Sequence, residues 1–290
     1  MTIRNPVEWG ADQMALAAQA MRSASNAFGY VETTIDGSQP QVRHIELSDL
    51  KDVLLRGFKD YGAYRTDILF ICVIYPFAGL VLAQFAWSFG ALPLIFPLVS
   101  GFALIGPFAA AGLYEMSRRQ EQGKPISWAD AFGVFGSPSF TAIIKLGLLL
   151  LALFALWLAA AMAIYMLTLG PDMPASLSTF VNDIFTTPAG WAMIIVGIAV
   201  GALFALVALA ISVVSFPLLL DRPVSVWTAI STSLQAVMRN PVPMLAWGAI
   251  VAASLVIGAI PALIGLIVVM PVLGHATWHL YRKVVAPRGG

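Results

Sequence analysis

Residues 143–168 read IIKLGLLLLALFALWLAAAMAIYMLT and contain one charged side chain, Lys145. A helix needs about 20 mainly apolar residues to cross the hydrocarbon core of a bilayer, and this segment exceeds that length. Lys145 lies close enough to one end for its ammonium group to reach the membrane surface. The segment therefore predicts a membrane-spanning helix.

The composition of the whole chain agrees with this prediction. Of the 290 residues, 59% are hydrophobic and 11% are charged, whereas a soluble domain carries about 25% charged residues. So few charges cannot cover a water-exposed surface, and lipid must solvate much of the chain. The net charge of +1 argues against a nucleic-acid partner. The single cysteine, Cys72, excludes an intrachain disulfide.

Six segments are long and apolar enough to cross a membrane as helices. They cover residues 68–88, 91–114, 143–168, 189–217, 243–259 and 260–280. The last two share one apolar stretch that Gly258 and Pro261 divide; in an alternative interpretation, one of the two is re-entrant. We predict an all-α, polytopic helix bundle over residues 46–285. A cytoplasmic tail, loosely ordered or a docked helix, precedes it over residues 1–45, and a short tail follows over residues 286–290.

The positions of the basic residues predict the orientation. All 16 Lys and Arg residues fall before the first segment, in or beside the second and fourth connections, or after the last segment. The other connections contain Asp172 and Asp183 and no basic residue. Because basic residues favour the cytoplasmic side, we predict a multi-pass protein of the bacterial inner membrane with both termini in the cytoplasm.

Three short helical segments precede the first, third and fifth predicted spans, at residues 48–58, 125–132 and 223–230. In each, a serine (Ser48, Ser127 or Ser225) occupies the position of a helix N-cap. The second and third share a Pro-x-Ser pattern and a following tryptophan, Trp128 or Trp227. We predict an internal repeat of three hairpins, each introduced by an interfacial helix with its tryptophan at the headgroups. Amphipathic helices also occur between spans without any repeat.

Two motifs within the spans concern helix packing. Gly197 and Gly201 match the small-residue pattern that lets membrane helices approach closely, within one chain or between protomers. Gly106-Pro107 predicts a kink in the second span.

Two histidines are the candidates for metal or haem binding. His275 and His279 are spaced i, i+4, so their imidazoles share one helix face. A metal site needs at least one further ligand, and the remaining histidine, His44, lies in a distant part of the sequence. We favour two hydrogen-bonded histidines near the membrane interface, and we predict no cofactor.

A dense group of charges follows the second predicted span. Tyr114, Glu115, Arg118, Arg119 and Lys124 form a candidate cytoplasmic interaction cluster. Glu115 is spaced i, i+3 and i, i+4 from the two arginines, which predicts an ion pair. Such a cluster can bind lipid phosphates or a partner protein, or it can serve as a positive-inside anchor alone.

The same region resembles a known family. The residues that carry the resemblance are GPF at 106–108, GLYE at 112–115, SRR at 117–119, E-x-GKP at 121–125, and VR-x-I at 42–45 with Leu50, Leu54, Gly57 and Asp60. They resemble a bacterial family of uncharacterised, predicted integral membrane proteins, some of whose members are labelled cytochrome c oxidase subunit I. The resemblance covers residues 42–285 and implies a membrane fold without an assigned activity. Three histidines are too few for the haems and copper that the oxidase label implies.

The functional hypotheses follow from what the predicted spans lack. They contain no deeply placed ionisable pair and no nucleophile with a nearby base, which argues against a coupled pump and against an enzyme. We favour a non-enzymatic accessory or scaffold protein, with membrane lipids and a respiratory or photosynthetic membrane complex as partners. A facilitative transporter of a small solute or lipid is the alternative, and a haem or metal protein is the second alternative.

Overall fold

The computed structural model describes residues 40–72, 76–77, 79–81, 84, 92–124, 128–261 and 263–287. Within these residues the fold is helical, and one isolated antiparallel bridge joins Val42 to Val285. The predicted all-α class is therefore confirmed. Residues 1–39 of the predicted tail, much of the first predicted span and Ser127 lie outside the described residues.

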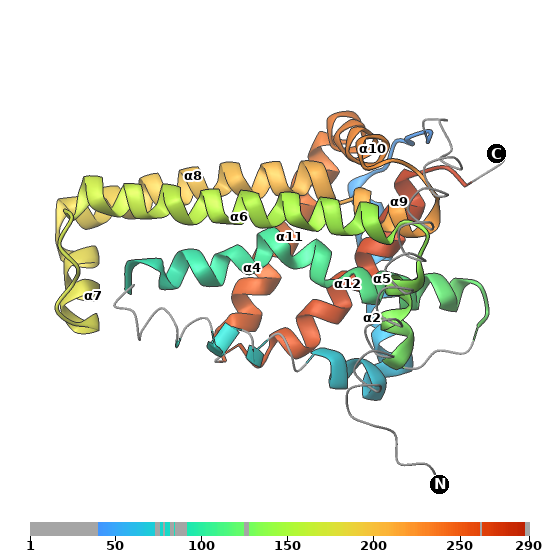
Figure 1. Cartoon of the computed structure of the whole chain (residues 1–290), viewed down its shortest axis with the longest axis horizontal. Coiled ribbons are helices and arrows are strands. Elements are labelled where there is room, and N and C mark those ends of the chain that lie inside the picture. The colour runs from blue at the N-terminus through green and yellow to red at the C-terminus, as the bar shows by residue number, and fades with distance from the viewer. Residues whose placement is uncertain are drawn as a thin grey trace, which may run out of the picture.

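The described chain folds into ten α-helices and two 3₁₀-helices (Figure 1). In chain order they are α2 (Leu47–Cys72), η1 (Leu92–Leu94), α4 (Ile95–Ala109), α5 (Ala111–Glu121), η2 (Trp128–Gly136), α6 (Phe140–Thr168), α7 (Leu177–Thr186), α8 (Pro188–Ser212), α9 (Ser215–Asp221), α10 (Val226–Arg239), α11 (Pro241–Ala259) and α12 (Leu266–Val284).

The long helices α6 and α8 form an antiparallel hairpin, and α7 crosses its far end (Figure 1). A Cβ atom at Gly201 would lie 3.1 Å from the Trp157 ring, so this glycine allows α8 to pack on α6. The Trp157 indole also donates a 3.1 Å hydrogen bond to the Pro97 carbonyl of α4. Gly201 therefore makes a contact within the chain. A Cβ atom built at Gly197, in contrast, would have no neighbour within 4 Å.

Three helical segments of the described chain are long and apolar enough to cross a membrane: Phe140–Thr168, Pro188–Asp221 and Pro241–Ala259. They coincide with the third, fourth and fifth predicted spans. The second predicted span, residues 91–114, is not among these three segments; its helix is interrupted at Ala110 between α4 and α5, close to the kink predicted at Gly106-Pro107. Pro107 has no N–H group to continue the helical hydrogen bonds, and the break follows within one turn of it.

The local forms of the three predicted interfacial segments differ. Ser225 caps α10 as predicted, accepting a 3.0 Å hydrogen bond from the Thr228 N–H. Ser48 is not an N-cap, because α2 already begins at Leu47 and continues unbroken to Cys72; there the Asp49 carboxylate accepts from the Glu46 N–H. The second segment, η2, is a 3₁₀-helix.

The exposure of Trp227 agrees with the prediction for the third segment, and a break in the chain follows it. Asn240 separates α10 from α11, which starts at Pro241. Trp227 is 77% exposed on α10, as an interface anchor requires.

The most buried helix is α12, which packs against α2 and α5. Its residues from Met270 to Trp278 are all buried. A Cβ atom at Gly57 of α2 would lie 2.7 Å from both the Ala276 Cβ and the Val272 carbonyl oxygen. On another side of α12, a Cβ atom at Gly274 would lie 2.7 Å from Leu113. At Gly57 the contact includes backbone atoms of α12, so a side chain would force the helices apart, whereas at Gly274 the Leu113 side chain would have to shift.

We expect Gly57→Ala to destabilise the protein by about 1–3 kcal/mol, because the added methyl group overpacks the contact with α12. Gly62→Ala is the matched control in the same helix, since a Cβ atom there meets nothing within 4 Å. It should be neutral or stabilising by about 0.4–1 kcal/mol. Thermal unfolding in mild detergent compares the two variants, and equal effects would contradict the close contact.

Candidate functional site

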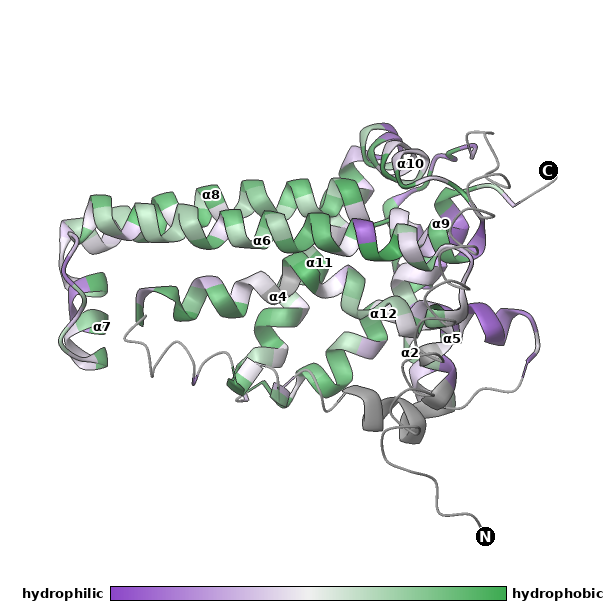
Figure 2. Cartoon of the chain, in the orientation of Figure 1, coloured by the Kyte–Doolittle hydropathy of each residue, from purple (hydrophilic) through white to green (hydrophobic). Residues whose placement is uncertain are grey.

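Polar and charged side chains gather at one end of the molecule, which we call the basic end (Figure 2). It is formed by α2, α5, α9, α10 and the C-terminal half of α12. The basic residues in or next to these elements are Arg43, Lys51, Arg56, Lys59, Arg118, Arg119, Lys124, Arg222, Arg239, Arg282 and Lys283. At the opposite end, the described chain carries Asp172 and Asp183 beside and within α7.

A group of four polar side chains, three buried and one half-buried, joins α2, α5 and α12 at the basic end. We call these residues, Asp60, Ser117, His275 and His279, the polar junction. His279 Nε2 lies 2.8 Å from Asp60 Oδ2, and Ser117 Oγ lies 2.6 Å from His275 Nδ1 and 3.5 Å from Asp60 Oδ2. His275 is 1% exposed, and its Nε2 atom has no hydrogen-bond partner among the described residues. The junction thus links three helices through polar contacts that are buried at His275 and partly open to solvent at His279.

The two histidines do not converge on a common point. His275 contacts Ser117, whereas His279 contacts Asp60. Among the described residues, no three His, Cys, Asp or Glu side chains are arranged to hold a metal ion. The pairing of each histidine with a neighbouring helix agrees with the interpretation that we favour from the sequence, hydrogen-bonded histidines.

Asp60 and Ser117 were not identified as site residues from the sequence. Their partners lie far away in the chain: Asp60 is 219 residues before His279, and Ser117 is 158 residues before His275. Two signals were available: both residues belong to the motifs that carry the family resemblance, and Asp60 lies one helical turn after Gly57 on the same face of α2.

The predicted interaction cluster separates into parts. Glu115 is buried and accepts hydrogen bonds from Arg118 Nε at 2.7 Å and from Arg119 Nε at 3.0 Å. Arg119 also pairs with Asp130 of η2. The hydrogen bond to Glu115 raises the pKa of Arg118 above its ordinary value. The ion pair predicted from helical spacing is therefore present between Glu115 and both arginines. The Arg119–Asp130 ion pair in addition connects α5 to η2.

The two other members of this cluster lie apart from the ion pairs. Tyr114 is 2% exposed, and its side chain is hydrogen-bonded to Thr277 of α12. Lys124 is exposed just after α5. Most of the predicted interaction cluster is thus engaged in contacts within the chain.

A second group of ion pairs connects α12 to α2. Lys283 Nζ lies 2.6 Å from Asp49 Oδ1 and 3.0 Å from Asp52 Oδ2. The backbone N–H of Glu46 and then Lys283 lower the pKa of Asp49, and hydrogen bonds from Lys283 and Arg56 lower that of Asp52. The same two carboxylates raise the pKa of Lys283.

Asn240 fixes the segment before α2. Its side chain is fully buried, its Oδ1 atom accepts a 2.8 Å hydrogen bond from the Ile45 N–H, and its Nδ2 group donates to the Arg43 carbonyl at 3.1 Å. The amide therefore satisfies two backbone groups of the extended segment whose other groups pair with residues 284–286.

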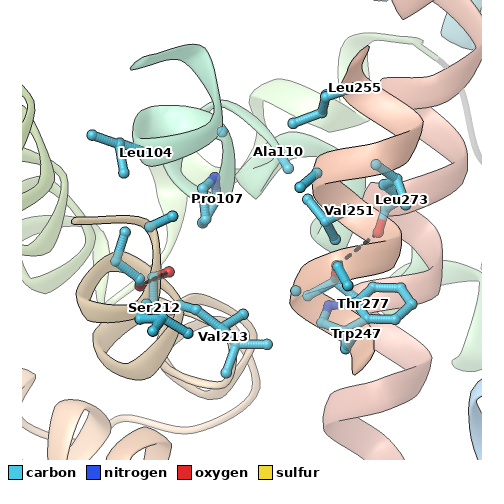
Figure 3. A pocket seen from close by; sticks show the side chains of 18 of the residues that line it. Leu104, Pro107, Ala110, Ser212, Val213, Trp247, Val251, Leu255, Leu273 and Thr277 are labelled. Atoms are coloured by element: carbon cyan, nitrogen blue, oxygen red, sulfur yellow. Dashed lines mark hydrogen bonds between the residues drawn. The ribbon is translucent and has the colours of Figure 1, made fainter. Parts of the chain in front are cut away.

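A cavity of about 420 Å³ lies between α4, α8, α11 and α12. Its lining is mostly alanine, leucine, valine and glycine, and it contains no charged side chain. Ser212, Thr277 and Trp247 lie at one end, and Leu104 and Leu255 at the other (Figure 3). This volume is within the usual range of small-molecule sites.

The hydroxyl groups of the cavity are anchored to their own helices. Ser212 Oγ donates to the Ala208 carbonyl, and Thr277 Oγ1 donates to the Leu273 carbonyl at 2.7 Å (Figure 3). Ser212 Oγ keeps lone pairs that can accept a hydrogen bond, whereas Thr277 Oγ1, which is also hydrogen-bonded to Tyr114, keeps one. The cavity therefore combines an apolar body with a small, uncharged polar end.

Residues 94–221 match the family described as predicted integral membrane protein (DUF2189). The matched range runs from the end of η1 to the end of α9 and contains the motif at residues 106–125. The resemblance noted from the sequence is therefore confirmed over these residues, and the family description supports an integral membrane protein. Comparisons with curated proteins and with solved structures give no match.

We expect Asp60 and His279 to be energetically coupled. In a double-mutant cycle with Asp60→Asn and His279→Gln, the coupling free energy should be about 1–3 kcal/mol, since the pair is largely shielded from solvent. Thermal or denaturant unfolding of the four proteins in detergent supplies the data. Additive effects of the two substitutions would show that the contact contributes nothing.

The Lys283 ion pairs predict an acid-dependent loss of stability. Because the carboxyl pKa values of Asp49 and Asp52 are lowered by folding, their contribution is present above about pH 4 and is lost as the pH falls through their folded values. Lys283→Gln should therefore flatten the fall in melting temperature at acid pH. The effect is small because these side chains are partly exposed. Lys124→Gln, at an exposed lysine outside this pair, should leave the profile unchanged.

Proposed function

We propose that this protein is a non-enzymatic integral membrane protein that binds the acyl chain of a lipid in the cavity between α4, α8, α11 and α12. The observation that carries the proposal is the uncharged, apolar cavity of about 420 Å³ beside α8 and α11, both parts of segments apolar enough to cross a membrane. Ser212, the last residue of α8 before α9, and Thr277, in the C-terminal half of α12, place the polar end of the cavity nearer the basic end. A lipid would place its chain along Leu104 and Leu255 and its more polar atoms beside these hydroxyl groups.

The source of affinity in such a site differs from that of a soluble pocket. Lipid tails are already apolar surroundings, so the hydrophobic effect does not drive an acyl chain from the bilayer into the cavity. Binding instead depends on close packing against the lining and on the few polar contacts. Small residues such as Ala205, Ala208 and Ala252 provide the space, and the hydroxyl oxygens favour a headgroup region that donates a hydrogen bond.

The cavity changes the order of the hypotheses derived from the sequence. The alternative derived from the sequence was a transporter of a small solute or lipid, and the cavity favours a lipid as the bound molecule. The described contacts offer no specific argument for an accessory or scaffold role. Net transport requires a second conformation with different access to the cavity, so we propose lipid binding and not transport. Association with a respiratory or photosynthetic complex stays a prediction.

The proposed orientation places the basic end in the cytoplasm of a bacterial cell, with the protein in the inner membrane and both termini inside. The positions of Lys and Arg in the elements of the basic end and the acidic residues near α7 support this orientation through the positive-inside preference. It also places the polar end of the cavity toward the inner leaflet.

Ala252→Phe should reduce lipid binding severalfold, because Ala252 lines the cavity and a benzyl group there occupies the space of the acyl chain. The measurement is the amount of lipid that co-purifies with the protein, and the binding of a fluorescent fatty acid after reconstitution in nanodiscs.

Ala253→Phe is the matched control, because Ala253 is the next residue of α11, is also exposed, and lies outside the lining. It should bind as the wild type does. Equal binding by both variants, or the absence of any lipid bound more tightly than bulk lipid in the wild type, would refute the proposed site.

A further inference from the structure

The turn that joins α11 to α12 is apolar throughout. Residues 256–266, which we call the hairpin tip, read VIGAIPALIGL. Four of the side chains are more than half exposed: Val256, Ile257, Ile260 and Ile264. The connection between α6 and α8 is different, since it carries Asp172, Asn182 and Asp183. The apolar composition of the hairpin tip suits hydrocarbon, and the polar composition of the α6–α8 connection suits water.

The backbone of the tip satisfies its own donors. The Ile260 N–H bonds to the Val256 carbonyl, the Leu263 N–H to the Ala259 carbonyl, and the Ile264 N–H to the Pro261 carbonyl, at 3.0–3.2 Å. Pro261 has no N–H group to satisfy. An irregular turn in hydrocarbon must pair its backbone groups internally, because no water is present to do so. The tip meets that requirement at these positions.

The backbone conformation of Leu263 also indicates that lipid surrounds the tip. Its φ angle is +68°, in the left-handed region where, after glycine, asparagine and aspartate are the favoured residues. An aqueous turn has access to these polar residues at little cost, whereas in hydrocarbon their side chains are expensive. An apolar leucine in this conformation is consistent with a turn that lipid surrounds.

The position of the tip in the fold agrees with its composition. Along the longest axis of the molecule, α7 lies at the extreme end of the α6–α8 hairpin, whereas the turn between α11 and α12 lies well short of it (Figure 1). The two flanks of the shorter hairpin, Asn240 and Arg282, both lie at the basic end. Gly258 and Gly265 let its two helices meet closely, since a Cβ atom at Gly265 would lie 2.7 Å from the Gly258 carbonyl oxygen.

We infer that α11 and α12 form a re-entrant hairpin, which enters the bilayer from the basic side, turns in the hydrocarbon and returns to the same side. Its tip contacts lipid acyl chains and does not emerge on the α7 side. The predicted spans 243–259 and 260–280 would then both end within the bilayer, which preserves the common location of the two termini. The inference rests on the tip alone and is independent of lipid binding in the cavity.

Cysteine accessibility in nanodiscs tests this inference, because both faces of the bilayer are open to a charged maleimide. In a Cys72→Ala background, which removes the single native cysteine, Ile260→Cys and Ile264→Cys report on the tip. Met173→Cys, beside Asp172, and Lys124→Cys, at the basic end, are the water-exposed references. The tip cysteines should react roughly tenfold or more slowly than both references, since the reactive thiolate is disfavoured in hydrocarbon. After denaturation in SDS, all four should react alike.

Two outcomes would overturn the inference. Reaction of Ile260→Cys or Ile264→Cys as fast as Met173→Cys would show that the tip emerges into water. If the tip cysteines react slowly, a spin label at residue 264 distinguishes lipid from protein around the tip. Its collision rates are measured with oxygen, which partitions into lipid, and with a nickel chelate, which stays in water. Oxygen collisions without chelate collisions support a lipid-embedded tip. Low collision rates with both would show that protein covers the tip.

Discussion

The contact between α2 and α12 at Gly57 is the constraint on which the basic end of this protein depends. With no side chain between the two backbones, Gly57 brings α2 onto Val272 and Ala276, and one turn later Asp60 reaches His279. Two turns earlier on α2, Asp49 and Asp52 reach Lys283. A larger residue at position 57 would separate the helices and remove these polar partners together, because all of them require the same interhelical distance.

The central position of α12 explains why a helix that carries two histidines and a threonine can lie next to lipid-facing helices. Buried polar groups cost free energy unless they are hydrogen-bonded, and Ser117, Asp60 and Tyr114 provide partners from α2 and α5. On another side of α12, the lining of small residues leaves the cavity. One helix thus separates a polar junction from an apolar space, and the cavity obtains its polar end from Thr277 of that helix.

Some local features were predictable because the residues that make them are neighbours in the chain. The Ser225 cap forms with the N–H of Thr228 three residues away, and Glu115 pairs with arginines three and four residues away. The Ser48 cap was wrong because the apolar and charged residues around it extend one long helix, whose first turn begins at Leu47. The interruption of the helix at Ala110 lies three residues after Pro107, so the kink predicted at Gly106-Pro107 is another local feature that the sequence carries, because proline lacks the N–H group that continues the helical hydrogen bonds.

Composition and the spacing of apolar residues were sufficient for the helical class, for a membrane environment and for three helices able to cross it, since each depends on residues close together in sequence. The positions of Lys and Arg likewise predicted one basic end. Tertiary packing determined which distant residues meet: Asp60 with His279, Asn240 with the segment at residues 43–45, and four helices around one cavity. The reason is physical, because a hydrogen bond or an empty volume between helices depends on interhelical distance and rotation, which small changes at glycine contacts set and local periodicity does not encode.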